Sequence, residues 1–371
     1  MKIVKIFAGI AVATVVALSS TSCENRDVEY GDFDYQTVYF GNQFPVRTLE
    51  LGEDLYVDNS IDNEHKVIIK ATIGGTRNNT KDITIGFAVD NTLCNGLYFN
   101  GTNTPLTPMP ASYYELASNT MTIPAGSILG GVEVKLTDAF FADPKALSNN
   151  YVIPLVMTNV VGADSILRGT PLVANPNRCI DADWNVKPRD FVLYAVKYVN
   201  KWHGNYLRRG TDNVVKDGVT ATEVRHSQYV ENDPVYTLTT SSLSQLNFPL
   251  SFLSKQKVNL PIPLQLSFDS NSNCTIGQPS SSIQVSDSVL IYNIALTKGQ
   301  GKFAQKGELN SFGGKSRDAI YLDYSISFEV QSTFPKAKLP LIHEVRSYAT
   351  KDTLVLRDRG VAPEYFTVVK K

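Results

Sequence analysis

Short runs of alternating or continuous apolar residues, separated by clusters of turn residues, repeat along most of this chain. Residues 65–73 (HKVIIKATI) and 82–89 (DITIGFAV) are rich in β-branched side chains, and GGTRNN stands between them. β-branched residues pack well on a pleated surface, and Gly and Asn favour tight turns. Helical periodicity is hard to find in the first half of the chain. The pattern therefore predicts an all-β fold of antiparallel strands.

The first half gives the expected spacing of a two-layered β domain. Further strand-like runs occur at 131–136 (GVEVKL) and 151–157 (YVIPLVM), with Pro- and Gly-containing turns before them. Many short strands joined by polar turns are typical of an immunoglobulin-like β-sandwich. We expect this domain to cover residues 37–185. Residues 175–190 (NPNRCIDADWNVKPRD) contain two prolines and no alternation, and they predict the joint between domains.

The second half contains longer strand candidates. Residues 191–198 (FVLYAVKY) are expected to open it, and long runs follow at 320–330 and 343–356, joined by hairpin-like links such as KGQGK. Tyr321, Tyr324, Ile326 and Phe328 show roughly the two-residue alternation of a sheet with one buried face. This half predicts an antiparallel, lipocalin-like barrel or a second sandwich over residues 190–371.

The N-terminus has the layout of an export signal. Lys2 and Lys5 precede an apolar run at residues 6–18, and small residues then lead to Cys23. A bilayer-spanning helix needs roughly 20 apolar residues, so a cleavable signal is the better interpretation. We expect a lipoprotein signal peptide at 1–22, lipidation of Cys23 and a flexible tether at 23–36. The alternative is an ordinary secretory peptide with a cysteine nearby by chance. Lipidation predicts a protein anchored to the outer membrane and facing the cell surface.

Few residues indicate chemistry. The four histidines are isolated, and the spacings of zinc sites, serine nucleophile elbows and phosphate loops are absent. With 35 basic and 36 acidic residues, the net charge of -1 offers no basic field for nucleic acid. The acidic loop 58–64 lacks the Gly and Glu of a calcium loop, which favours a solvated turn. We therefore predict no metal, no cofactor, no nucleic-acid partner and no catalytic residues. A glycosidase needs only two carboxylates, which any sequence supplies.

Aromatic residues give the candidate ligand site. Sugar-binding proteins place flat rings against the apolar face of a pyranose, with amides and carboxylates beside them. Trp202 and Tyr206, with Asn205 between them, form one candidate platform at the domain joint. Tyr113 and Tyr114 in the first domain form the second. The alternatives are that Trp202 plugs the end of a barrel and that the tyrosines belong to the core.

The Cys23 signal, the segments YYELASNTMTIPAGS, GGVEVKLTDAFFAD and YVIPLVMT, and the segment KYVNKWHGNYLRRG together carry a family resemblance. The chain resembles two-domain Bacteroidetes surface lipoproteins, with an immunoglobulin-like N-terminal domain of unknown function and a barrel-like C-terminal domain. Members are similar to the SusE and SusF type of glycan-binding lipoprotein. The resemblance implies non-catalytic glycan binding in a polysaccharide-utilisation system, beside an outer-membrane transporter.

Two other functions remain open at the level of sequence. The first is a structural or adhesin-like lipoprotein whose strand edges pair with a protein partner. The second is a glycosidase that uses a carboxylate pair in the domain joint.

Overall fold

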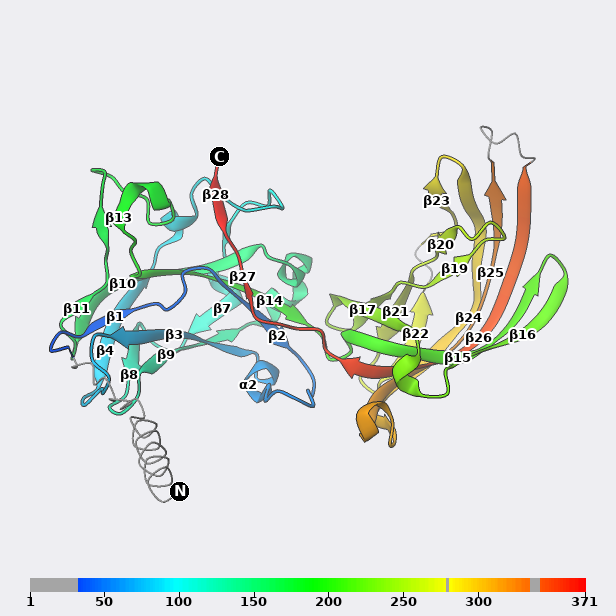
Figure 1. Ribbon diagram of the computed structural model, residues 1–371, viewed down its shortest axis with the longest axis horizontal. Helices are drawn as coiled ribbons and strands as arrows, with labels where there is room; N and C mark the ends of the chain where they lie inside the picture. The colour runs from blue at the N-terminus through cyan, green and yellow to red at the C-terminus, as the bar shows by residue number, and fades with distance from the viewer. Residues whose placement is uncertain (1–32, 278–279, 334–340) are drawn as a thin grey trace, which may run out of the picture.

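The computed structural model describes residues 33–277, 280–333 and 341–371, which fold into two β domains (Figure 1). The only α-helices in these ranges are the short α2 (Ser60–Asn63) and α3 (Asp138–Ala142). The prediction of an all-β, two-domain fold is confirmed. The predicted signal, Cys23 and most of the tether lie outside the described residues. Within the described ranges, no helix combines the length and the apolar character needed to span a membrane.

The N-terminal domain is built on one large sheet in the order β11-β1-β3-β9-β8-β4-β10-β14-β2-β27, with β6 on β10 and β7 on β9. Its strands are β1 (Thr37–Tyr39), β2 (Pro45–Glu50), β3 (Lys66–Gly74), β4 (Ile83–Val89), β6 (Thr107–Pro108), β7 (Tyr114–Leu116), β8 (Thr120–Ile123), β9 (Leu129–Leu136), β10 (Tyr151–Val161), β11 (Ser165–Ile166), β14 (Phe191–Val199) and β27 (Glu364–Tyr365). Two small pairs complete it: β5 (Leu97–Phe99) with β28 (Val368–Lys370), and β12 (Thr170–Pro171) with β13 (Trp184–Val186). Short 3-10 helices lie between strands: η1 (Asn91–Cys94), η2 (Ala111–Tyr113), η3 (Pro144–Leu147) and η4 (Asp181–Asp183).

Burial along the strands explains how this sheet encloses a core. In β3 every second residue is buried, because one face packs inward and the other faces solvent. In β10 and β14 the apolar run is nearly continuous, because both faces are covered. One face of β14 contacts the main apolar core through Val192 and Val196. The opposite face contacts a second cluster through Phe191 and Leu193, together with Phe366 from the C-terminal segment.

The boundary between the domains differs from the sequence-based expectation of a second domain over residues 190–371. Strand β14 pairs with β10 and β2 of the N-terminal sheet, so residues 191–199 belong to that sheet. After the barrel the chain returns, and β27 and β28 pair with β2 and β5. Local alternation could not reveal this, since strand pairing is decided by contacts far apart in sequence.

The C-terminal domain is an eight-stranded antiparallel barrel with the order β15-β17-β18-β21-β22-β24-β25-β26, closed by pairing of β26 with β15. Its strands are β15 (Gly204–Lys216), β17 (Val235–Ser242), β18 (Gln245–Phe248), β21 (Leu264–Phe268), β22 (Asn273–Gly277), β24 (Val289–Glu308), β25 (Arg317–Ser332) and β26 (Ile342–Asp358). The strand β16 (Val219–Arg225) pairs antiparallel with the second half of β15, β23 (Ile283–Ser286) pairs with β24, and β19 (Ser251–Leu253) pairs with β20 (Asn259–Pro261). Two 3-10 helices, η5 (Val230–Asn232) and η6 (Phe312–Gly314), contact each other beside the wall.

The barrel interior is apolar on one side and charged at the seam where β15 meets β26. Arg208 donates from Nε to Asp352 (3.0 Å) and from Nη2 to the Tyr324 hydroxyl (3.1 Å). Arg225 donates to the other Asp352 oxygen at 2.6 Å and also pairs with Asp212. Burial raises the pKa of Tyr324, which therefore stays protonated and donates to Asp352 at 3.0 Å. Each charge of this network is thus matched by a partner inside the barrel.

Candidate functional site

Trp202 and Tyr206 are part of the barrel core. The indole of Trp202 is 4% exposed and stacks on Phe268 at 4.2 Å between ring centroids, while the Lys201 ammonium lies 4.5 Å from the indole centroid. Tyr206 is fully buried and donates its hydroxyl to the Trp202 carbonyl at 2.7 Å. A sugar needs an open ring face, and neither ring offers one. The prediction that Trp202 and Tyr206 form a platform is therefore wrong in this structure, and Trp202 packs at the end of the barrel.

Asn205 is occupied by other groups of the chain. Its Nδ2 donates to Asp358 Oδ1 at 2.6 Å, and its Oδ1 accepts from the Thr237 hydroxyl at 2.6 Å. These bonds link β15 to β26 and β17. Asn205 therefore has a structural role in closing the barrel, which differs from the predicted ligand contact.

The second predicted pair, Tyr113 and Tyr114, packs against the sandwich core. The Tyr113 ring makes an edge contact with Tyr151 at 5.6 Å, and its hydroxyl donates to Asp143 at 3.0 Å. Asp143 also accepts from the Tyr151 hydroxyl at 2.5 Å. The two predicted aromatic pairs thus lie in different domains. Each pair contacts other residues of its own domain's core.

A polar groove lies on the outer face of the barrel, where β22, β24, β25 and β26 run side by side. Its volume is about 710 Å³, within the ~300–1,000 Å³ typical of ligand sites. Strand register places its outward side chains in two adjacent rows: Lys302, Tyr321 and Thr353 in one, and Gln300, Asp323 and Lys351 in the next. Their neighbours along the strands, such as Leu322 and Asp352, are buried inside the barrel.

Two glycines shape the wall at this groove. A Cβ on Gly301 would lie 2.4 Å from the Tyr321 carbonyl oxygen, and one on Gly299 would lie 2.7 Å from the Ile276 carbonyl oxygen. Either distance is too short for a real side chain, so only glycine fits at these positions. The missing side chains let β24 draw close to β22 and β25 where the groove lies.

The groove offers hydrogen-bonding groups of several kinds around one aromatic ring. The Tyr321 hydroxyl donates to Glu308 at 2.7 Å, and burial together with this carboxylate raises the pKa of Tyr321 to about 12. Lys298 and Asp323 form an ion pair at 2.6 Å. Lys302 and Lys351 are exposed and make no ion pair within the described part of the chain. Ammonium, amide, carboxylate and hydroxyl groups beside a ring can together bind the hydroxyls and the apolar face of a sugar.

Sequence reasoning missed this groove for a specific reason. The sequence pattern places Tyr321 on one buried face with Tyr324, Ile326 and Phe328. Side chains at odd and even positions of a strand point to opposite faces of the sheet, so Tyr321 faces outward while Tyr324 faces inward. A strict count of the alternation would have separated them. The rest of the groove comes from four strands over residues 273–353, so no local motif marks it.

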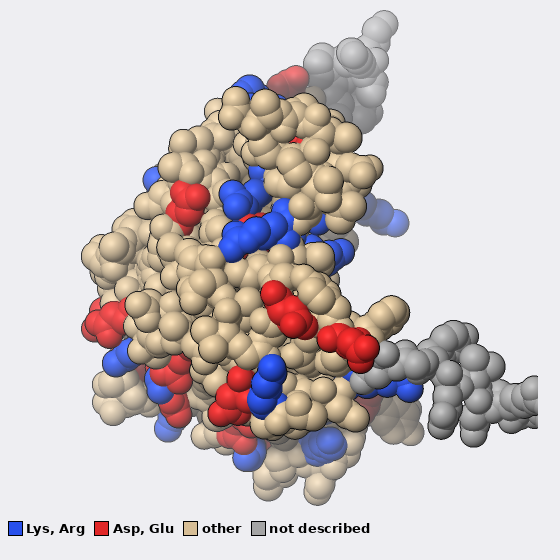
Figure 2. Space-filling view, turned by 90° about the vertical axis from the view of Figure 1, so that its left-hand side faces the viewer, with Lys and Arg blue, Asp and Glu red and all other residues tan. Residues whose placement is uncertain are grey.

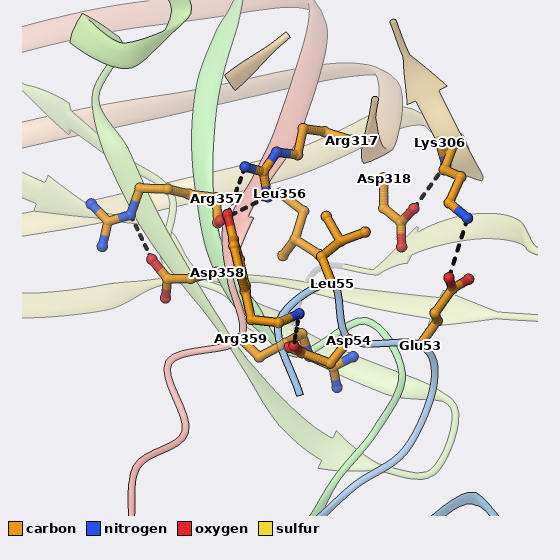
Figure 3. A pocket seen from close by; sticks show the side chains of 11 residues that line it. Glu53, Asp54, Leu55, Lys306, Arg317, Asp318, Leu356, Arg357, Asp358 and Arg359 are labelled. Atoms are coloured by element: carbon orange, nitrogen blue, oxygen red, sulfur yellow. Dashed lines mark hydrogen bonds and ion pairs between the residues drawn. The ribbon is translucent and has the colours of Figure 1, made fainter. Parts of the chain in front are cut away.

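The domain joint is tightly packed (Figure 3). The loop that carries Glu53 and Tyr56 contacts the end of β26 and the start of β25, and Arg317 donates to the Tyr56 hydroxyl at 2.7 Å. Arg359 donates from Nη2 to the carbonyls of Leu51 (2.9 Å) and Asn200 (2.7 Å). The cavity between these groups measures about 10 Å³, the size of a single water.

Two carboxyl groups lie at this joint, beside a neighbouring hollow of about 270 Å³. Glu53 pairs with Lys306 at 3.2 Å, and Asp318 accepts the Lys306 backbone N–H at 2.8 Å. Burial, with Glu53 nearby, raises the pKa of Asp318. A catalytic carboxylate pair in the joint, the third function considered from sequence, could use these two groups or Asp54 and Asp358, which line the adjacent cavity.

The structure also bears on the expected metal chemistry. Asp62, predicted to lie in a solvated acidic turn, is 1% exposed, accepts the Glu50 N–H at 2.9 Å and pairs with Arg47. The turn therefore packs against the sandwich through Asp62, while Asp58 and Glu64 are exposed as predicted. Among the residues the structure describes, no three His, Cys, Asp or Glu side chains are grouped to hold a metal ion.

The fold and the groove define a two-domain β protein in which a sandwich carries a closed barrel with a ligand-sized polar surface. Comparison with known proteins gives the family. The "Domain of unknown function (DUF5627)" matches residues 201–360, and a model of an N-terminal domain matches residues 33–164. A Bacteroides ovatus protein of unknown function is 48% identical, with 91% of this chain and 100% of that chain covered and a TM-score of 0.78. The chain belongs to this family of two-domain Bacteroides proteins of unknown function.

More distant solved structures include a second Bacteroides ovatus protein of unknown function, 16% identical over 90% of this chain and 99% of that one, with a TM-score of 0.39. An auxiliary nutrient binding protein from Bacteroides thetaiotaomicron is 12% identical over 86% of this chain and 95% of that one, with a TM-score of 0.35. These TM-scores are too low to establish a shared fold. A search of the curated proteins found no match.

Proposed function

We propose that this protein binds glycans without turning them over, and that the polar groove on the barrel is where the sugar lies. In this proposal the mature chain is held at the outer membrane by lipid on Cys23, faces the cell surface and serves a polysaccharide-utilisation system beside a transporter, as SusE- and SusF-type proteins do. The observation that carries the proposal is the groove of about 710 Å³ that Tyr321 lines together with polar side chains.

The chemistry of the groove fits a neutral or mixed-charge sugar chain. Sugar hydroxyls both donate and accept hydrogen bonds, and the rows beside Tyr321 supply Gln300, Thr353 and Asp323 for both roles. The pyranose also has an apolar face, which an aromatic ring covers with little loss of conformational entropy. The groove is open to solvent, so a longer chain could continue past the bound units.

The carboxylates of the groove support binding over hydrolysis. Glycosidases place two carboxyl groups on either side of the scissile bond. Of the two aspartates that line the groove, Asp323 pairs with Lys298 on the outer face. Asp352 is 3% exposed, and both its oxygens accept bonds from Arg208, Arg225 and Tyr324. Neither position supplies an acid and base pair that faces one sugar bond.

Substitution of Tyr321 tests the proposal. Wild-type protein is screened against polysaccharides and oligosaccharides by affinity electrophoresis and titration calorimetry. For the glycan that wild type binds in the screen, Tyr321→Ala should have an affinity about fivefold to tenfold weaker, because loss of a stacked ring costs about 1 kcal/mol. Tyr321→Phe keeps the ring and should stay close to wild type. Tyr229→Ala removes a tyrosine that is 60% exposed at another site and serves as the control.

A free strand edge favours a second candidate function, pairing with a protein partner. All seven residues of β16 are exposed or partly exposed, and β15 is its sole partner among the described strands. An exposed edge offers unpaired backbone groups that another strand can use. Val224→Lys places a charge at an exposed edge position and opposes such pairing. If this candidate is correct, a protein that co-purifies from native membranes is lost in Val224→Lys, while glycan binding stays unchanged.

A further inference from the structure

A second charged feature lies in the N-terminal domain, away from the barrel. Asp190, just before β14, is fully buried. Arg178 donates to both of its oxygens, from Nε at 3.1 and 3.3 Å and from Nη2 at 3.0 Å. Arg168, just after β11, places Nη1 3.6 Å from the same carboxylate. One buried acid therefore holds two arginines side by side.

Arg168 and Arg189 are fixed mainly by backbone oxygens. Arg168 donates from Nη2 to the Thr158 carbonyl at 2.7 Å and from Nη1 to the Met157 carbonyl at 3.4 Å. Arg189, adjacent to Asp190, donates from Nη1 to the Gly41 carbonyl at 3.1 Å. Carbonyl oxygens position a guanidinium without cancelling its charge. Arg178 and Arg168 thus share one carboxylate, and Arg189, adjacent to Asp190 in sequence, adds a third guanidinium, which leaves an excess of positive charge.

These arginines remain accessible. The side chain of Arg168 is 50% exposed and that of Arg178 is 32% exposed. Figure 2 views the end of the molecule that carries β11 and β13 and shows basic side chains gathered in a hollow of the surface. Each guanidinium has five N–H donors, and those of Arg168 and Arg189 are only partly used by the described part of the chain.

We propose that Arg168, Arg178 and Arg189 form an anion-binding site, the arginine hollow, for the carboxylate or sulfate group of an acidic sugar. Planar guanidinium groups match both anions by paired hydrogen bonds, and an arrangement that is already fixed loses little entropy on binding. Asp190 holds Arg168 and Arg178 beside each other and is itself neutralised by Arg178, so it opposes an incoming anion only weakly. The claim that the bound anion belongs to a sugar rests on the proposed glycan binding, whereas the claim that an anion binds here does not.

The test uses two ligands that separate these claims. Titration calorimetry at low salt measures the affinity of the full mature chain for inorganic sulfate and for an oligoglucuronate or oligogalacturonate. Arg168→Gln and Arg189→Gln should each weaken both affinities about tenfold or more, as expected for loss of a charge-assisted hydrogen bond. Arg77→Gln, an exposed arginine of the same domain, should bind as wild type does. Unchanged thermal midpoints show that each variant folds.

The outcomes separate the inference from the proposed function. Absence of sulfate binding in wild type, or sulfate binding that is equal in Arg168→Gln, overturns the anion site even if Tyr321-dependent glycan binding stands. Sulfate binding that depends on Arg168, without binding of any acidic oligosaccharide, retains the anion site and overturns the sugar assignment. Tyr321→Ala should leave sulfate binding unchanged, because the groove and the hollow lie in different domains.

Discussion

The sandwich and the barrel are both β domains, but they keep their charges in different places. The sandwich core is apolar between its layers, and basic side chains gather in a hollow at one end (Figure 2). The barrel encloses a network of Arg208, Asp352, Arg225 and Asp212 along one side of its interior. Its outer wall carries the polar groove.

The position of the buried network explains the difference. A barrel must close by pairing its first and last strands, and Arg208 and Asp352 on those strands are 144 residues apart in sequence. A register shift at this seam would separate the paired charges, which is costly inside a barrel. We interpret the network as the element that specifies the register of closure. The sandwich does not close on itself in this way, and its buried aspartates, Asp62 and Asp190, pair with arginines outside the apolar core.

Asp352→Ala should produce the largest effect. The substitution leaves Arg208 buried without its carboxylate, which typically costs about 3–5 kcal/mol, while Arg225 keeps Asp212. The chain has two tryptophans, Trp184 in the sandwich and Trp202 in the barrel core. In a Trp184→Phe background, urea unfolding followed by Trp202 fluorescence reports on the barrel. The expected result is a strongly lowered midpoint.

The matched change in the sandwich is Leu155→Ala, at a fully buried position of the apolar core. It should destabilise the sandwich by about 2–5 kcal/mol through loss of burial and a residual cavity. In the same background, the Trp202 transition should shift by no more than roughly 0.5 kcal/mol, as for sites without shared partners. An equal shift of the Trp202 transition in both variants would contradict the separation of the two cores.

A smaller effect is expected from pH at the barrel entrance. His203 Nδ1 accepts the Thr240 N–H at 3.2 Å, and burial, with Arg359 and Lys197 nearby, lowers the pKa of His203 from 6.5 to about 4. Below pH 6.5 the unfolded chain takes up a proton that the folded chain does not, so stability falls as pH drops toward 4. We expect a loss of about 1–2 kcal/mol between pH 7 and pH 4.5.

His203→Asn serves as the matched variant, because its Oδ1 can accept the same N–H and does not titrate. Urea midpoints of wild type and variant at both pH values measure the difference. The variant should lose less stability than wild type on acidification. Parallel losses would show that other groups dominate the pH response.

The sequence predicted the class of fold but not which side chains face solvent. Alternation in residues 65–73 and the long runs after residue 320 were enough to predict strands and a barrel-like second half. The environment of Trp202 could not be predicted from neighbouring residues. A tryptophan at the start of a strand can pack inside or face a ligand, and here its stacking partner, Phe268, lies 66 residues further along the chain. The arginine hollow could not be predicted for the same reason, because Asp190 contacts Arg168 and Arg178 only in the folded domain, where β14 pairs with β10.

The boundary of the second domain shows the same limit. The run FVLYAVKY is apolar throughout because β14 is covered on both faces, and one of those faces is covered by the returning C-terminal segment. No property of residues 191–198 alone indicates which domain they join. Register and chain return are global properties, whereas composition and alternation are local ones.

The central claim is that the barrel groove binds glycan through Tyr321. The most direct measurement is titration calorimetry of wild type, Tyr321→Phe and Tyr321→Ala with the glycan that wild type retains in affinity electrophoresis. We expect nearly equal affinities for wild type and Tyr321→Phe, and about fivefold to tenfold weaker binding for Tyr321→Ala with an unchanged thermal midpoint. Absence of glycan binding in wild type, or equal affinity in Tyr321→Ala, would contradict it.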